Sequence, residues 1–212
     1  MIKQQNDLIS LFLKFTIIDM QLVFATNNKH KIEEVRHLLK NKFPLLSLKG
    51  INCNEELPET GNTLKENALQ KAKYVHEKYK VDCFADDTGL EIEVLNERPG
   101  VYSARYAGEE CSAEKNIKKV LEEMKNASNR NASFKTIIAL IINNKEYLFE
   151  GVIDGIIPSE PRGKLGFGYD PIFQPKGFEK SFAEISIAEK NNISHRAIAI
   201  KKLSEFLNQL KS

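Results

Sequence analysis

The sequence predicts an α/β protein that forms one domain. Segments with strand-like alternation and segments with helix-like apolar periodicity follow one another through 212 residues. This length allows one large domain or two small lobes with a shared core. A hydrophobic content of 42% and a charged content of 28% are ordinary for a globular protein. We find no internal repeat and no change of composition that marks a second independent domain.

The charge and the cysteines exclude several classes of protein. A net charge of +2 gives no general basic field, so we expect no nucleic-acid partner. Cys53, Cys83 and Cys111 are far apart and form neither a disulfide framework nor a zinc pattern. We expect all three to be small buried hydrophobes in a protein of the reducing cytoplasm.

The first residues, 1–19, do not fit the rest of the chain. Ile9 to Ile18 is mostly apolar, but it is interrupted by Lys14 and is too short to span a membrane. No small-residue cleavage site follows, so a signal peptide is not indicated and we expect no membrane partner. We interpret residues 1–19 as a poorly ordered N-terminal extension of a domain that comprises residues 20–212. The alternative is a short helix docked on that domain.

The first strand and helix enclose a candidate anion site. Gln21 to Ala25 is typical of a strand, and an apolar helical stripe extends from Ile32 to about Asn41. The residues between them read Thr26-Asn-Asn-Lys-His-Lys31. Free backbone N–H groups and the helix dipole at such a turn favour a phosphate. The alternative is that Thr26 or Asn27 only caps the helix.

A second strand and helix follow. Leu45 to Ile51 is predicted to be a strand, and residues 64–79 form an amphipathic helix after a loop. Thr63-x-x-Glu66 fits a capping box, which favours a structural role for Glu66. We expect Lys71 and Lys73 to be solvated on the polar faces of this helix.

Two adjacent carboxylates, Asp86 and Asp87, follow an apolar strand over residues 81–85. We predict a tight turn at Thr88-Gly89 and a half-exposed strand from Leu90 to Leu95. Adjacent carboxylates repel unless a cation lies beside them, and a divalent metal is the common solution. The alternative is a turn in which an Asp side chain caps its own backbone.

The second half of the chain contains a hairpin and a functional loop. Ser112 is predicted to cap a helix, and residues 134–142 and 147–157 form two strands joined at 143–145. The loop 158–175 is rich in Gly and Pro. Its aromatic residues Phe167 and Tyr169 either present a stacking face to a nucleobase or fill the core. Gly166-x-Gly168 lacks the setting of a dinucleotide fingerprint.

The last helix starts in an unusual way. Ser194 is predicted to be its N-cap, which places His195 and Arg196 in the first turn. Cations at this position oppose the helix dipole. An acceptor-rich group is therefore expected in front of them.

Together these segments resemble one family. The matching motifs are Thr26-Asn-Asn-x-x-Lys31, Leu57-Pro-Glu-Thr-Gly61, Glu66-Asn-Ala68, Ala85-Asp-Asp-Thr-Gly-Leu90, Pro99-Gly-Val-Tyr-Ser-Ala-Arg105, Gly166-Phe-Gly-Tyr-Asp-Pro171 and Ser194-His-Arg196. In this order they resemble the non-canonical purine nucleoside triphosphate pyrophosphatases, the inosine/xanthosine triphosphatase family. The resemblance extends from about Met20 to the C-terminus. Asn27 departs from it, because many members have Gly there; Asn tolerates a left-handed backbone.

The resemblance implies an elongated mixed β-sheet flanked by helices, with two lobes and the active site in the cleft between them. It also implies a homodimer. The implied reaction is Mg²⁺-dependent: ITP, dITP, XTP or dXTP is cut between the α and β phosphorus atoms to the nucleoside monophosphate and pyrophosphate, which cleanses the nucleotide pool.

The matching positions suggest a role for each site residue. Glu59 and Asp87 are the candidate Mg²⁺ ligands, with Asp86 as a candidate supporting residue. Asp87 is the candidate catalytic residue, as general base for the attacking water. The implied substrate-binding residues are Thr26, Asn27, Asn28, Lys31, Thr88, Phe167, Gly168, Tyr169, Asp170, Lys190, His195 and Arg196. Of these, Thr26, Asn28 and Lys31 would hold phosphates, Phe167 would stack on the base, and Asp170, Lys190, His195 and Arg196 would read its edge.

Two other functions fit the same residues. One is a pyrophosphatase with another base preference, similar to the Maf-like nucleotide pyrophosphatases. The other is a nucleotide-binding module without activity. The intact carboxylates and Lys31 favour an enzyme, because a silent module need not keep a metal site.

Overall fold

The computed structural model describes residues 21–39 and 43–210, so the predictions for residues 1–19 lie outside it. The described strands are β1 (Leu22–Phe24), β2 (Leu45–Ser47), β3 (Cys83–Ile92), β4 (Arg98–Pro99), β5 (Asn131–Ile142), β6 (Lys145–Ile156) and β7 (Gln174–Pro175). The α-helices are α2 (Lys29–Leu39), α3 (Leu64–Tyr79), α4 (Ala113–Glu123), α5 (Ile187–Ile193) and α6 (His195–Leu210). Short 3₁₀ helices are η1 (Leu48–Ile51), η2 (Glu93–Leu95), η3 (Gly100–Arg105), η4 (Asp170–Ile172) and η5 (Phe182–Glu184).

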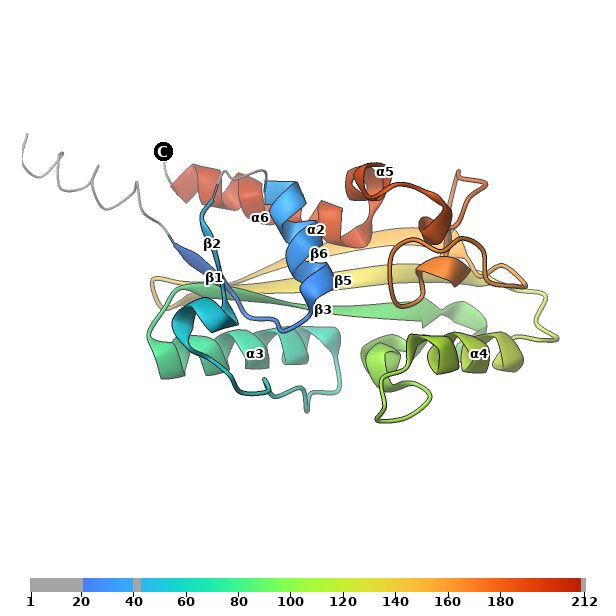
Figure 1. The fold of residues 1–212 in the computed structure, drawn as a ribbon, viewed down its shortest axis with the longest axis horizontal. Helices are drawn as coiled ribbons and strands as arrows, with labels where there is room; N and C mark the ends of the chain where they lie inside the picture. Colours follow the sequence, from blue (N-terminus) through green and yellow to red (C-terminus); the bar gives the residue numbers. More distant parts are fainter. Residues whose placement is uncertain (1–20, 40–42, 211–212) are drawn as a thin grey trace, which may run out of the picture.

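The described strands form one mixed sheet, in the order β2-β1-β3-β5-β6-β7, with β4 added to the edge of β3. β1 is parallel to both β2 and β3, whereas β5 is antiparallel to both of its neighbours, β3 and β6. The sheet is elongated, and helices cover both of its faces (Figure 1). This confirms the predicted mixed α/β sheet. The division into two lobes stays a prediction.

Helices pack on both faces of the sheet through separate apolar clusters. One cluster joins α2 and α6 to Phe24, Phe84 and Leu140. On the opposite face, α3 packs on Cys83, Ala85 and neighbours. Figure 1 shows α2 and α6 on one side and α3 and α4 on the other. Alternate residues of β3 therefore face different helices, as the pleat of a strand requires.

Several local predictions are confirmed. The β5–β6 hairpin turns at Asn143 and Asn144, whose φ angles of 50° and 60° suit asparagine in a two-residue turn. Ser112 accepts a hydrogen bond from Lys115 N, and Ser194 accepts one from Ala197 N, so both cap their helices.

The capping box predicted at Thr63 is half right. Glu66 N donates to Thr63 Oγ1, but the Glu66 carboxylate accepts from Asn62 N (2.7 Å) rather than from the N-cap residue. The second half of the predicted strand 45–51 is wrong, because it forms the 3₁₀ helix η1. Cys111 is exposed, unlike the buried Cys53 and Cys83, so the prediction of three buried cysteines is also wrong.

The predicted turn at Thr88-Gly89 is wrong, and Asp86 and Asp87 do not lie at a strand end. β3 is continuous and pairs with β5 from Cys83 to Ile92. Glycine is required at position 89 for another reason: the backbone of Gly100 packs closely against it. A Cβ atom at position 89 would lie 2.6 Å from the carbonyl oxygen of Gly100.

Candidate active site

The site lies where the sheet has a gap. β1 pairs with β3 only as far as Phe84, and β4 pairs with β3 only from Glu91. Between these points, one edge of β3 has no strand partner among the described residues. Lys71 Nζ donates to Asp86 O (2.7 Å) and Leu90 N donates to Ser103 Oγ (2.9 Å), so side chains replace the missing strand. A cavity of about 660 Å³ opens beside this gap.

The two adjacent carboxylates project to opposite faces of the sheet. Asp86 shares a face with Phe84 and meets groups from α2 and α6, whereas Asp87 shares a face with Ala85 and meets groups from α3. Each carboxylate thus has its own counter-charge. A shared metal is not required to keep them apart.

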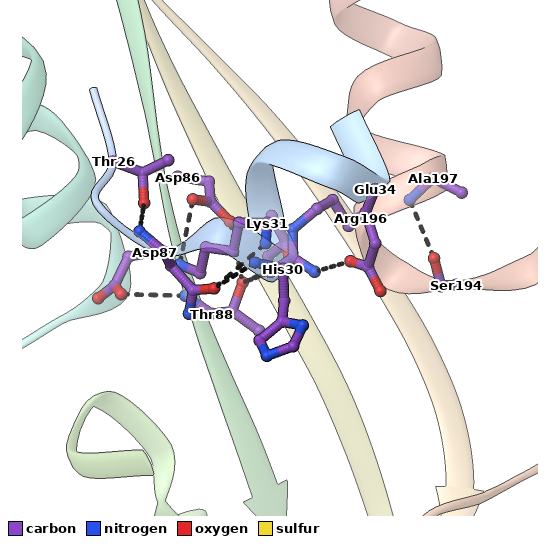
Figure 2. A network of polar contacts seen from close by, with 12 residues as sticks. Thr26, His30, Lys31, Glu34, Asp86, Asp87, Thr88, Ser194, Arg196 and Ala197 are labelled. Atoms are coloured by element: carbon purple, nitrogen blue, oxygen red, sulfur yellow. Dashed lines mark hydrogen bonds and ion pairs between the residues drawn. The ribbon is translucent and has the colours of Figure 1, made fainter. Parts of the chain in front are cut away.

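Asp86 is buried among cations (Figure 2). Lys31 Nζ donates to Oδ1 (3.1 Å), and Arg196 Nε donates to Oδ2 (3.1 Å). Arg196 Nη2 also donates to Thr88 Oγ1 (3.0 Å). Burial disfavours the charged carboxylate, but Lys31 and Arg196 outweigh it and hold the pKa of Asp86 well below its usual range. Both carboxylate oxygens of Asp86 are bound by cationic side chains, and 1% of its side chain is exposed. Asp86 is therefore placed to hold the surrounding side chains in position rather than to bind a metal.

The ion pairs continue from Arg196 toward the Gly-rich loop. Arg196 Nη1 donates to Glu34 of α2, and Lys190 of α5 contacts both Glu34 (2.9 Å) and Asp170 (2.6 Å). Burial disfavours the Glu34 carboxylate, yet Arg196 and Lys190 lower its pKa overall. Cations and anions thus alternate through the protein from Lys31 to Asp170, and this chain ties α2, β3, α5 and α6 together.

Asp87 has fewer counter-charges. Asn67 Nδ2 donates to its Oδ2 (3.2 Å), and Lys71 Nζ lies 3.6 Å from its Oδ1. Burial raises the pKa of Asp87, and the charge of Lys71 only partly opposes this. Lys71 also donates to Glu59, whose side chain is 36% exposed. Burial disfavours the Lys71 ammonium, but Asp87, Glu59 and Asp86 raise its pKa.

The first turn of α2 closes one side of the cavity. Asn28 is the cap, because its Oδ1 accepts hydrogen bonds from the backbone of His30 (3.0 Å) and Lys31 (3.2 Å). Asn28 N in turn donates to Thr26 Oγ1. The prediction that Thr26 or Asn27 caps this helix is therefore wrong, because the capping residue lies one or two positions later. Asn27 does not adopt a positive φ, so the left-handed turn considered for it is not formed.

The aromatic side of the cavity comes from the Gly-rich loop. Phe167 N donates to Asp170 Oδ2 (2.8 Å), which folds the loop back on itself. Gly166 has a φ of 75°, and a Cβ atom there would lie 2.1 Å from the same carboxylate, so glycine is required. Phe167 is partly exposed to the cavity. Tyr169 belongs to the core, and its hydroxyl donates to Ser103 O (2.8 Å).

His195 combines burial with an unused polar atom. Its ring stacks on Phe134 with centroids 4.6 Å apart, and 3% of the residue is exposed. Its Nδ1 is buried and has no hydrogen-bond partner. Burial and the neighbouring Arg196 and Lys190 hold the pKa of His195 well below its usual value, so the ring is neutral at pH 7. An unpaired buried nitrogen in a cavity wall is a candidate contact for a ligand.

Apart from the candidate supporting residue Asp86, every residue predicted to act in catalysis, metal binding or substrate binding lines this one cavity. These residues are Thr26, Asn27, Asn28, Lys31, Glu59, Asp87, Thr88, Phe167, Gly168, Tyr169, Asp170, Lys190, His195 and Arg196. Their individual roles stay predictions. Asp86 and Glu66 do not line the cavity.

The sequence interpretation missed Lys71, Asn67 and Glu34. The prediction that Lys71 is solvated is wrong, since its side chain is 6% exposed. The spacing contained a signal: Leu64, Ala68, Lys71 and Val75 follow each other at intervals of three and four, which places Lys71 in the apolar stripe of α3. A lysine at such a position needs a buried partner. Glu34, next to Val35 on α2, gave only a weaker signal of this kind.

Comparison with known proteins identifies the class. The Ham1 family model matches residues 22–206, and the chain therefore belongs to the Ham1 family. This confirms the resemblance drawn from the seven motifs.

Similar proteins carry more specific names. A dITP/XTP pyrophosphatase of Flavobacterium psychrophilum is 56% identical over 187 residues, which is 88% of this chain and 98% of the relative. One of Bacillus subtilis is 46% identical over 195 residues, covering 90% of this chain and 98% of the relative. The solved structure of a HAM1 protein from Coxiella burnetii matches with a TM-score of 0.83 and 39% identity, and covers 90% of this chain and 99% of that one.

Within residues 21–39 and 43–210, no helix has the length and apolar character needed to cross a membrane.

Proposed function

We propose that this protein hydrolyses the non-canonical purine nucleoside triphosphates ITP, dITP, XTP and dXTP to the monophosphate and pyrophosphate. One observation carries the proposal. A single cavity joins a carboxylate–lysine group, suited to a metal and phosphates, to an aromatic ring surrounded by polar groups that suit a base. Its volume of about 660 Å³ lies within the range of nucleotide-sized ligands. The names of the relatives support the same activity.

The donor set fits Mg²⁺. Glu59 and Asp87 together carry two negative charges against the one charge of Lys71, so this end of the cavity has a deficit of positive charge. Mg²⁺ prefers one or two carboxylates and takes its other ligands from phosphate and water. Within the described ranges, no group of three or more His, Cys, Asp or Glu side chains is placed to hold a metal, so the proposal rests on the two carboxylates of Glu59 and Asp87. When bound, Mg²⁺ would neutralise charge on the triphosphate.

The chain's own residues would then divide the work. Asp87, fixed by Asn67 and raised in pKa by burial, would accept the proton of the attacking water. Lys71, between Glu59 and Asp87, supplies a positive charge beside the reacting phosphate. Thr26, which precedes α2, and Lys31, in the first turn of α2, would hold the remaining phosphates.

Base selection would rest on the opposite end. Hypoxanthine and xanthine carry a keto oxygen at position 6, which accepts a hydrogen bond, whereas adenine has an amino donor there. The unpaired Nδ1 of neutral His195 can donate to the keto oxygen. Arg196 uses three of its five N–H groups on Asp86, Glu34 and Thr88 and retains others for the base. Each mismatch leaves a buried polar group unpaired and costs about 1–3 kcal/mol.

The cellular setting and assembly are also proposals. The three free cysteines suit a reducing compartment, which supports a cytoplasmic location. A homodimer is proposed on the family resemblance.

A panel of triphosphates tests the function. We expect pyrophosphate release from dITP, ITP and XTP in Mg²⁺, release from ATP slower by at least one order of magnitude, and no release when EDTA removes the metal. A preference for another base would contradict the proposed substrates. A protein that binds these nucleotides without releasing pyrophosphate would be the silent module.

A further inference from the structure

The imidazole of His30 covers the aromatic ring proposed to hold the base. The rings of His30 and Phe167 are stacked, with centroids 5.0 Å apart and planes inclined by 11°. Both side chains line the cavity. One face of an aromatic ring accommodates one stacked partner at a time, since stacked partners lie in van der Waals contact. A base that stacks on this face must therefore replace His30.

Little holds the imidazole in place. The backbone N of His30 donates to Asn28, but neither ring nitrogen has a hydrogen-bond partner in the part of the chain that the structure describes. Figure 2 shows the ring pointing away from the ion pairs of Lys31, Glu34 and Arg196. The side chain can thus rotate away from Phe167 with the loss of one stacking contact and no polar contact.

His30 is also the neighbour of Phe167 that an entering ligand meets first. Two charged groups also lie near the Phe167 ring: Lys190 Nζ, 4.9 Å from the centroid, and the Arg196 guanidinium, 5.8 Å from it. Both residues are at least 96% buried, since their exposed fractions are 4% and 1%. His30, by contrast, is exposed. Of these three neighbours of Phe167, His30 is therefore the one that solvent reaches.

We propose that His30 is a displaceable cover of Phe167: its imidazole occupies the place of the base in the nucleotide-free protein and competes with every ligand that carries one. The inference rests on the proposed stacking of the base on Phe167. Competition by the tethered His30 ring weakens the binding of ligands that carry a base. It leaves the binding of ligands without a base unchanged. It also favours release of the monophosphate product, because His30 reoccupies the ring as the base departs.

Inhibition constants test the cover. In His30→Ala, we expect the Ki of inosine monophosphate to fall about two- to tenfold, the factor that corresponds to one aromatic stacking contact. The Ki of inorganic tripolyphosphate, which has no base, should stay unchanged. His30→Phe retains a stacked ring of larger apolar area, so it should raise the Ki of inosine monophosphate. His37→Ala is the matched control, since His37 is exposed on the same helix and does not line the cavity.

The outcomes separate this inference from the proposed function. A wild-type protein that releases no pyrophosphate from any of the four proposed substrates overturns the proposed function, and the dissociation constants of inosine monophosphate and tripolyphosphate then test the cover in place of the inhibition constants. If the wild type is active, an unchanged or higher Ki of inosine monophosphate in His30→Ala overturns the cover alone, because His30 would then be neutral or would support the base. Equal shifts for inosine monophosphate and tripolyphosphate also overturn it, since they place the effect of His30 on the phosphates.

Discussion

The two ends of the cavity balance their charges in different ways. At the end proposed for the base, Arg196 and Lys190 are paired with buried carboxylates, and this chain of ion pairs continues through Asp86 to Lys31, which is proposed to bind a phosphate. At the other end, Lys71 faces both Glu59 and Asp87, and the carboxylates are more exposed.

This difference matches two kinds of task. Recognition of a base edge benefits from groups that are already in place, because little order has to be created on binding. The end proposed for hydrolysis would have to exchange ligands, and a site with surplus negative charge is suited to take up a cation. We therefore expect substitutions at the two ends to damage different properties of the protein.

The largest expected effect is on catalysis, in Asp87→Asn. The loss of a general base lowers the rate by roughly 10²–10⁴-fold, and the loss of a metal ligand adds to this. Stability should not fall, because an uncharged amide removes the burial penalty that raises the pKa of Asp87. The measurements are kcat for dITP and the midpoint of urea unfolding. Near-wild-type turnover in the folded variant would remove Asp87 from the mechanism.

Arg196→Ala should damage stability and selectivity. The change leaves Asp86 and Glu34 buried without their common partner, which costs about 3–5 kcal/mol. In molecules that remain folded, the ratio of kcat/KM for dITP to that for dATP should shrink by about ten- to a hundredfold. Urea unfolding and the two specificity constants are the measurements.

Arg196→Lys is the control for this prediction. It keeps the charge but loses the forked geometry, so it should be less destabilised than Arg196→Ala. An Arg196→Ala protein as stable as the wild type would contradict the structural role of the ion pairs. An equal fall of kcat/KM for both substrates would place Arg196 on the phosphates.

The smallest expected effect concerns His195. Its pKa in the folded protein lies well below the unfolded value of 6.5, so below pH 6.5 the unfolded chain binds a proton that the folded protein does not. Above pH 6.5 this group has no effect on stability. As the pH falls from 6.5 toward the folded pKa, His195 lowers the free energy of unfolding by about 1.4 kcal/mol per pH unit.

The variant His195→Phe isolates this contribution and keeps an aromatic ring beside Phe134. Urea unfolding at pH 7.5 and pH 5.5 measures it. The loss of stability between these pH values should be smaller in the variant by roughly 1 kcal/mol. Equal losses in both proteins would mean that His195 is protonated in the folded state.

The residues that line the cavity were predicted from the sequence more accurately than the backbone structure and side-chain contacts around them. Periodicity and capping signals located α3, α6 and the hairpin, because these features are local. The turn at Thr88-Gly89 was predicted wrongly, because Gly89 is required by the distant backbone of Gly100. That kind of requirement cannot be seen in the neighbouring residues.

The same limit explains why the environment of the buried charges was not predicted. Lys71 was assigned to a polar face because a lone lysine on a helix is usually solvated. Its partners Glu59 and Asp87 come from other segments, and only the folded chain brings them together. The alternation of Asp86 and Asp87 across the sheet likewise depended on knowing that β3 continues through them.

A crystal structure with Mg²⁺ and a non-hydrolysable dITP analogue tests the division between the two ends most directly. We expect Mg²⁺ beside Glu59 and Asp87 with the triphosphate near Lys31 and Lys71, and the base on Phe167 with its 6-keto oxygen toward His195 or Arg196. A base bound beside Glu59 and Asp87, or a metal bound at Glu34 and Asp170, would contradict the account.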